Sequence, residues 1–106
     1  MTMDHLKILV EDAFERRSEF SPANVPHELS VALDDCLELL DSGRARVAEP
    51  GAGGWRVNEW LKKAVLLYFR THDNQVIEGG YTRFYDKVPL KYAGMSPDRF
   101  RAGGTR

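Results

Sequence analysis

Apolar residues in the first forty positions recur every three or four residues, which is the spacing of one face of an amphipathic helix. The pattern predicts a helix from Thr2 to Arg17 and a second helix from Pro26 to Asp41, packed as an antiparallel pair. The proline-rich Ser21–Pro26 separates them, and Gly43 is expected to end the second helix in a left-handed conformation. The two apolar faces consist of Leu6, Leu9, Val10, Ala13 and Phe14, and of Leu29, Leu33, Cys36, Leu37 and Leu40.

A short alternating pattern follows Gly43. Arg44–Ala48 predicts a strand, Trp55–Val57 predicts its partner in a small hairpin, and Glu49–Gly54 predicts the loop between them. This loop has no Gly-Lys-Ser/Thr and no helix in phosphate-binding register. We therefore expect a hairpin tip and not a phosphate cradle.

A third helix is predicted from Glu59 to Phe69 or Arg70, with Asn58 as its N-cap. Apolar residues surround most of it, so it should be central to the domain. Its aromatic residues are expected to pack in the core and not to line a substrate cleft: Trp60, Tyr68 and Phe69. Its lysines are expected to be solvated and not to bind coenzyme A phosphates: Lys62 and Lys63.

The last third of the chain is less regular. Gln75–Glu78 predicts a short extended segment ended by two glycines, and Tyr81–Tyr92 is expected to be extended or irregular around Pro89. A last helical turn should run from Ser96 through Arg101. The fold class that these elements predict is α+β, mostly helical, within the single domain expected for 106 residues.

Composition limits the class of protein and the cellular location that we expect for the chain. No apolar run approaches the roughly 20 residues of a membrane helix, and the N-terminus lacks the basic leader of a signal peptide. Cys36 is the only cysteine, so no internal disulfide can form and a cytoplasmic location is expected. Five basic and eleven acidic residues precede Trp55, against ten and five from there on. This asymmetry favours either an anionic ligand or charge pairing across a fold or subunit contact.

Three basic residues lie among aromatic residues in the last third of the chain: Arg83, Lys87 and Lys91. Such interleaving can bind single-stranded nucleic acid. The slightly acidic net charge and the absence of a known nucleic-acid module argue against that interpretation. We expect neither a nucleic-acid nor a membrane partner.

The residues alone assemble no catalytic site. His5, His27 and His72 lie far apart, without a second metal ligand at helical spacing, so no metal site is expected. Cys36 lies on an apolar helix face, where a buried inert thiol is expected. Glu78 and Asp86 lie near glycines and aromatics, but the sequence does not make them an acid–base pair.

Five segments together resemble one enzyme family. They are AFERR at 13–17, LLDSGRARVAE at 39–49, WLKKAVLLYFR at 60–70, DNQVIEGG at 73–80 and FYDKVPLKY at 84–92. In order and spacing they resemble the N-terminal domain of the 2,3,4,5-tetrahydropyridine-2,6-dicarboxylate (tetrahydrodipicolinate) N-succinyltransferases. These acyltransferases act in bacterial diaminopimelate and lysine biosynthesis.

The resemblance implies that succinyl-CoA, as co-substrate, donates its acyl group directly to an amine of the dicarboxylate substrate, with no bound cofactor. It also implies a homotrimer built on a left-handed β-helix of hexapeptide repeats, beside which the helical domain contributes to the dicarboxylate site. No hexapeptide repeat occurs in these 106 residues. We therefore expect residues 1–101 to be the N-terminal domain, 102–106 to begin a linker to the missing β-helix, and the chain alone to be inactive.

One substrate ligand is implied by the resemblance. Arg99-Phe100, Gly104 and Arg106 follow the family's spacing before an arginine that binds a substrate carboxylate, which makes Arg106 the candidate substrate-binding residue. A guanidinium suits that role because it offers two parallel donors to a carboxylate. The alternatives are that Arg106 is a disordered terminal residue, and that the chain is a non-catalytic binding or interaction module reusing this domain.

Overall fold

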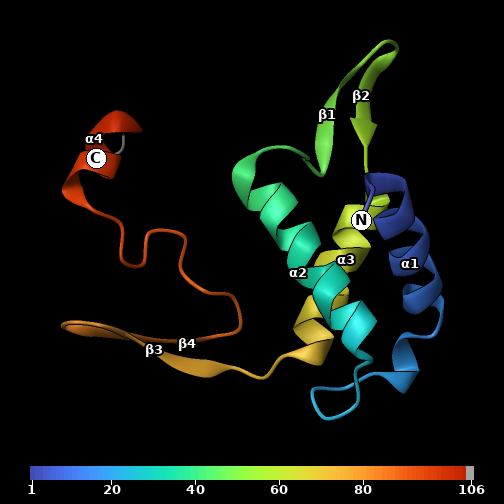
Figure 1. Ribbon diagram of the computed structural model, residues 1–106, viewed down its shortest axis with the longest axis horizontal. Coiled ribbons are helices and arrows are strands. Elements are labelled where there is room, and N and C mark those ends of the chain that lie inside the picture. Colours follow the sequence, from blue (N-terminus) through green and yellow to red (C-terminus); the bar gives the residue numbers. More distant parts are fainter. Residues whose placement is uncertain (105–106) are drawn as a thin grey trace.

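The computed structural model describes residues 1–104 of the chain. Three helices pack together on one side of the molecule, as Figure 1 shows: α1 (Met3–Glu15), α2 (His27–Ser42) and α3 (Glu59–Thr71). Helix α2 runs opposite to the other two, and a short 3₁₀ helix, η1 (Arg17–Glu19), follows α1. The predicted antiparallel helix pair is confirmed, and each predicted helix begins and ends within two residues of the observed one.

The ends of the first two helices follow local chemistry. The Thr2 hydroxyl accepts a hydrogen bond from the His5 amide at 3.2 Å and so caps the N-terminus of α1. Gly43 ends α2 with φ of 78°, a left-handed conformation that costs a glycine little because it lacks a Cβ atom. The predicted role of Gly43 is confirmed.

The first hairpin is displaced along the chain from its predicted position. Its strands are β1 (Ala48–Gly51) and β2 (Gly54–Val57), so Arg44–Val47 are not the predicted strand. The reason is that these residues complete the end of α2. The Ala45 amide donates to the Leu39 carbonyl at 3.1 Å, and the Ala45 side chain is buried against the core. Of the predicted loop Glu49–Gly54, only Ala52-Gly53 form the tip, because Glu49–Gly51 and Gly54 are paired in the strands.

Asn58 occupies the N-cap position of α3, but its side chain does not cap the helix. Its amide nitrogen Nδ2 instead donates to the Arg46 carbonyl at 2.7 Å and to a Glu49 carboxylate oxygen at 3.2 Å. The prediction of the position is confirmed, and the prediction of the capping bond is wrong. Asn58 joins the first hairpin to α3.

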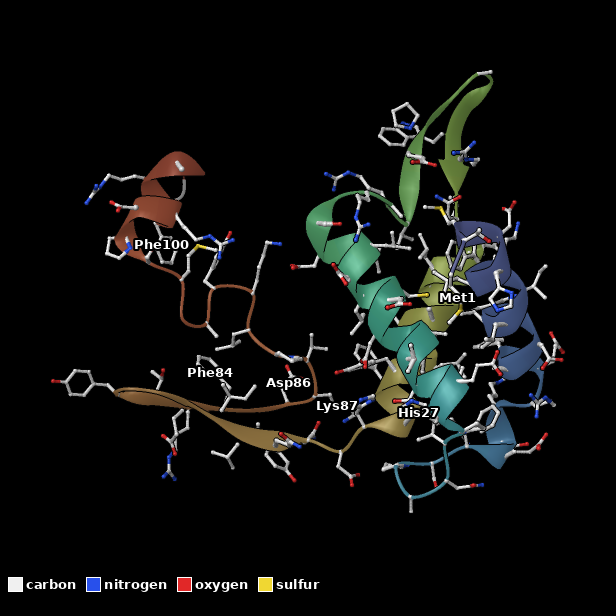
Figure 2. The ribbon with its side chains drawn as sticks, viewed as in Figure 1. Met1, His27, Phe84, Asp86, Lys87 and Phe100 are labelled. Carbon is white, nitrogen blue, oxygen red and sulfur yellow. The ribbon has the colours of Figure 1, made fainter. Side chains whose placement is uncertain are left out.

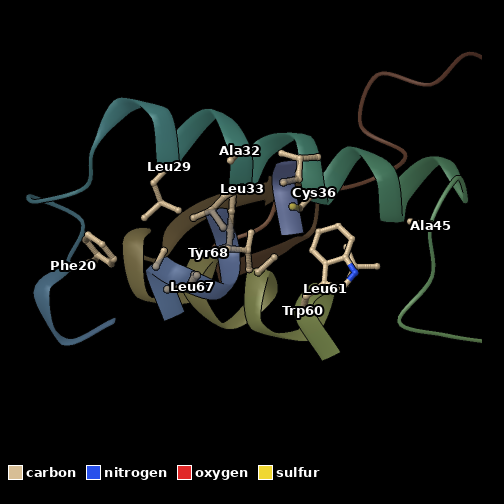
Figure 3. Packing of buried hydrophobic residues seen from close by; sticks show 14 residues of the cluster. Phe20, Leu29, Ala32, Leu33, Cys36, Ala45, Trp60, Leu61, Leu67 and Tyr68 are labelled. Atoms are coloured by element: carbon tan, nitrogen blue, oxygen red, sulfur yellow. The ribbon is translucent and has the colours of Figure 1, made fainter. Parts of the chain in front are cut away.

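The core lies between the three helices (Figure 3). Helix α3 packs against both α1 and α2, which confirms its predicted central place. Leu33 and Leu61 are fully buried, and each such leucine contributes about 1.5–3 kcal/mol. The buried apolar residues are Leu6, Val10, Ala13, Phe20, Leu29, Ala32, Leu33, Cys36, Ala45, Trp60, Leu61, Ala64, Leu67 and Tyr68.

The prediction that the Phe69 side chain packs in the core is wrong. Trp60 and Tyr68 are buried as predicted, but the Phe69 side chain is 43% exposed. It lies on the side of α3 turned away from the other two helices, next to exposed Leu66 and Arg70. The helix is therefore amphipathic, and not apolar on nearly all sides.

The chain leaves this three-helix bundle after Thr71. We call residues 72–104 the arm; it contains β3 (Gln75–Gly79), β4 (Thr82–Asp86) and α4 (Pro97–Ala102). Figure 1 shows the arm projecting away from the helices. The radius of gyration of 16.0 Å exceeds the roughly 13 Å expected for a compact domain of this length. None of the helices within residues 1–104 is long and apolar enough to cross a membrane.

Strands β3 and β4 form a second hairpin that the sequence did not predict. Val76 pairs with Tyr85, and Ile77 pairs with Phe84, across an antiparallel ladder. Gly80 opens the two-residue turn with φ of 76°, as a type II′ hairpin turn requires. The Tyr81–Tyr92 segment was expected to be extended or irregular, and its first part is a paired strand.

Candidate functional site

A groove of about 340 Å³ lies where the arm passes the bundle. Helices α2 and α3 form one side and arm residues 88–91 form the other. Its lining residues are Asp34, Leu37, Asp41, Tyr68, Val88, Pro89, Leu90 and Lys91. It is the place where the folded core and the arm meet.

Lys91 closes one end of this groove. Its ammonium donates to the Asp41 backbone carbonyl at 2.6 Å and also to the Asp41 carboxylate. Asp41 belongs to the last turn of α2, where a positive charge is stabilised by the helix dipole. Lys91 is therefore engaged in holding the arm to the bundle.

Tyr68 forms the floor of the groove. Burial, and secondarily the negative charge of Asp34, raise the pKa of the Tyr68 phenol. Its ring stacks on the His72 imidazole with centroids 3.7 Å apart, and His72 Nδ1 lies 3.0 Å from the Tyr68 carbonyl. The charged residues of the groove are thus Asp34 and the paired Asp41 and Lys91, which leave no unpaired basic group in its lining to bind a dianionic substrate.

Most of the other basic residues singled out in the sequence also have partners. Lys63 pairs with Glu11 of α1 at 2.6 Å and lies 5.4 Å from the centre of the Phe14 ring. The hydrogen bond to Glu11 raises the pKa of Lys63. Lys62 is exposed as predicted, whereas Lys63 holds α3 to α1 and is not simply solvated.

The two other basic residues that the sequence places among aromatic residues, Arg83 and Lys87, contact neighbouring polar groups. Arg83 pairs with Glu78 across the second hairpin at 3.0 Å. The Lys87 ammonium donates to the Asn74 side-chain oxygen at 2.5 Å. These contacts fix the base and the body of the hairpin.

Cys36 is fully buried, as predicted, and desolvation raises the pKa of its thiol to about 11. Asp35 adds a smaller contribution in the same direction. The thiolate that a nucleophile needs is therefore scarce at neutral pH.

The described residues assemble no acid–base or metal site from the candidates in the sequence. Glu78 faces Arg83, whereas Asp86 accepts from the Lys87 amide at 2.7 Å. The Thr71 hydroxyl lies 3.2 Å from His72 Nδ1, but it is buried and donates to the Leu67 carbonyl. Within residues 1–104 no three His, Cys, Asp or Glu side chains could together hold a metal ion.

Arg106, the candidate substrate ligand, lies outside the described residues. The residues that precede it are described: Ser96 caps α4, and Phe100 packs against Tyr92 with ring centroids 5.4 Å apart. Arg101 pairs with Asp98 at 3.0 Å. The predicted last helical turn is confirmed.

A second groove, of about 510 Å³, lies within the arm and was not predicted. Residues 88–94 fold back toward the second hairpin, and apolar side chains of both segments face the space: Ile77, Val88, Pro89, Leu90 and Ala93. Figure 2 shows Phe84 on the hairpin, with Asp86 and Lys87 at its base. A two-residue connection that begins with glycine, Gly80-Tyr81, was the signal that could have predicted this hairpin.

These features define a small α+β domain: a three-helix bundle that carries an extended arm and, in residues 1–104, no assembled catalytic groups. Its sequence matches one protein family, described as "Tetrahydrodipicolinate N-succinyltransferase N-terminal", over residues 5–71, which span the three helices. The chain belongs to this family.

Curated relatives extend the match beyond the bundle. The chain is 53% identical over 104 residues to the 2,3,4,5-tetrahydropyridine-2,6-dicarboxylate N-succinyltransferase of Alteromonas mediterranea. It is 54% identical over 104 residues to that of Alkalilimnicola ehrlichii, and 54% over 101 residues to that of Methylococcus capsulatus. The matches cover 95–98% of this chain but only 37–38% of the relatives' length.

Proposed function

We propose that this chain serves as the N-terminal domain of an acyltransferase that transfers succinyl from succinyl-CoA to tetrahydrodipicolinate in lysine and diaminopimelate biosynthesis. The observation that carries the proposal is sequence identity above 50% with three such enzymes across almost the whole chain. The setting is cytoplasmic, as expected for a biosynthetic enzyme with one cysteine.

In this role the chain supplies part of the dicarboxylate site and the remainder of the enzyme supplies the rest. Succinyl-CoA is a co-substrate of the complete enzyme, a homotrimer on a β-helix scaffold, and not a cofactor held by this domain. The groove beside Tyr68, where Lys91 is already bound to Asp41, does not suit a dicarboxylate. We therefore assign the substrate contact to Arg106, which follows the arm and is implied by the family resemblance.

Arg106 is the residue of this chain that we assign to a substrate carboxylate. A guanidinium keeps its charge at any working pH and donates two parallel hydrogen bonds. Arg101 lies close to it in sequence but already pairs with Asp98, so it serves as a control.

The test is a chimera in which this chain replaces the matched segment of the Alteromonas mediterranea enzyme. We expect the 106-residue chain alone to show no succinyl-CoA-dependent acylation, and the chimera to show it. Turnover by the chain alone, or an assembled chimera without turnover, would contradict the proposal. The second of these results would favour a non-catalytic interaction module.

The role of Arg106 is tested in the same chimera. Arg106→Ala should lower kcat/KM for the dicarboxylate about 10- to 100-fold, because it removes hydrogen bonds to a charged group. Arg101→Ala should change kcat/KM less than about twofold, since it removes only an exposed ion pair. Equal effects of the two substitutions would refute the assignment.

A further inference from the structure

The arm has regular secondary structure without a core of its own. No residue from 72 to 104 is buried. The arm nevertheless carries large apolar side chains, of which Tyr85 is 69% exposed, Val76 58% and Phe84 47%. An isolated two-stranded hairpin is at best marginally stable in water and needs a further layer to cover it.

Each face of the second hairpin carries one apolar cross-strand pair beside polar residues. The Val76–Tyr85 pair lies on one face, and the Ile77–Phe84 pair lies on the other because side chains alternate along a strand. The second face adjoins the 510 Å³ groove beneath residues 88–94. The Glu78–Arg83 pair shares the first face and the Gln75–Asp86 pair shares the second. Each face thus presents an apolar pair next to polar residues, which is the arrangement of an interface centre beside its polar rim.

Two basic residues of the arm already have acidic partners. Arg83 is paired with Glu78 on the hairpin, and Lys91 is held at the end of α2. Tyrosine and phenylalanine are enriched, and unpaired charges depleted, in the centres of protein interfaces. The exposed side chains of Val76, Phe84 and Tyr85 are therefore the part of the arm that suits the centre of an interface.

Two boundaries coincide at Thr71. The buried core ends there, and so does the region that matches the N-terminal domain family. The Alteromonas mediterranea enzyme, however, matches 104 of the 106 residues and therefore shares the arm. The arm is thus common to complete succinyltransferases, although it follows the segment that defines their N-terminal domain family.

We propose that the arm is a docking segment whose exposed apolar pairs, Val76–Tyr85 and Ile77–Phe84, pack against the part of the succinyltransferase that lies beyond the matched segment. The inference rests on the proposed function. Lys91, bound to Asp41 of α2, ties the arm to the bundle, and Lys87, bound to Asn74, holds the two ends of the second hairpin together within the arm. The bundle is then the unit that folds by itself, and the arm belongs to the interface.

The test compares two matched exposed positions by thiol labelling. Tyr85 on the arm is 69% exposed, and Ile8 on α1 is 71% exposed. Tyr85→Cys and Ile8→Cys are each made in the 106-residue chain and in the chimera with the Alteromonas mediterranea enzyme. Mass spectrometry separates their labelling from that of buried Cys36.

We expect Tyr85→Cys to react at least about tenfold more slowly in the chimera than in the chain alone, because a docked surface excludes the reagent. Ile8→Cys should react at the same rate in both. Equal rates for Tyr85→Cys would overturn the proposal. Protection in the chain alone that rises with concentration would also overturn it, in favour of a second copy as the partner.

A charge substitution gives an independent readout. Val76→Lys should make the arm of the chimera as sensitive to limited proteolysis as the arm of the chain alone, whereas Ile8→Lys should not. Succinyl transfer by the unsubstituted chimera separates the two proposals. An active chimera whose arm is not protected from labelling would contradict the docking proposal but not the proposed function. An inactive chimera whose arm is protected would contradict the proposed function but not the docking proposal. An inactive chimera whose arm is not protected would contradict both.

Discussion

The bundle and the arm differ in what holds them in place. Among residues 1–104, the fourteen buried apolar side chains all lie between Leu6 and Tyr68, and none lies in the arm. The helices of the bundle are also joined by side-chain bonds, such as Lys63 with Glu11, whereas the arm contacts the bundle through His72, stacked on Tyr68, and Lys91, bound to Asp41. The bundle therefore contains the interactions that determine its structure, and the arm depends on contacts outside itself.

The largest expected effect separates the two regions by stability. Leu33→Ala removes a fully buried side chain and should lower the free energy of unfolding by about 2–5 kcal/mol. Leu90→Ala, at a position 45% exposed in the arm, should change it by less than about 0.5 kcal/mol. Urea denaturation followed by circular dichroism measures both. Similar losses would show that the arm belongs to the same cooperative unit.

The second expected effect concerns alkaline pH. Burial raises the pKa of the Cys36 thiol from its ordinary value of 9.0 to about 11, so the unfolded chain releases this proton first. The free energy of unfolding should therefore fall by up to about 1.4 kcal/mol per pH unit between those values.

The matched variant moves the thiol to the arm. Cys36→Ala combined with Tyr85→Cys should lack this contribution to the pH dependence, because Tyr85 is exposed. Urea denaturation of both proteins from pH 8 to pH 11 gives the comparison. Identical slopes would mean that the Cys36 thiol ionises as easily in the folded protein as in the unfolded one.

The smallest expected effect uses two glycines with similar backbone conformations. Gly43, with φ of 78°, ends α2, and Gly94, with φ of 70°, lies in the arm. Gly43→Ala should lower the free energy of unfolding by about 1 kcal/mol. Gly94→Ala carries the same backbone conflict, but it should leave thermal unfolding of the bundle unchanged because the arm opens separately. Equal shifts in Tm would contradict this separation.

The same division decides what could be predicted from the sequence. The helices followed from the three-to-four spacing of apolar residues, because one face of each is buried in the shared core. The position of strand β1 was predicted wrongly because Ala45 belongs to the end of α2: its amide donates to the Leu39 carbonyl and its side chain is buried in the core. That burial depends on tertiary packing. The exposure of Phe69 was missed because the pattern could not show which side of α3 lacks a neighbour.

The second hairpin was missed for a different reason. Phe84 and Tyr85 are adjacent apolar residues on opposite faces of β4, so the alternation that indicates a half-buried strand is lost. The groove in the arm depends on that hairpin and could not be predicted without it. The candidate substrate ligand, Arg106, followed only from the family resemblance and stays a prediction.

Amide hydrogen exchange of the 106-residue chain is the most direct test of the division between bundle and arm. We expect amides within α1, α2 and α3 to exchange with protection that approaches global unfolding. Those of β3 and β4 should exchange nearly as fast as in an unfolded peptide, and should become protected only in the chimera. Hairpin protection equal to that of the helices in the chain alone would contradict the account.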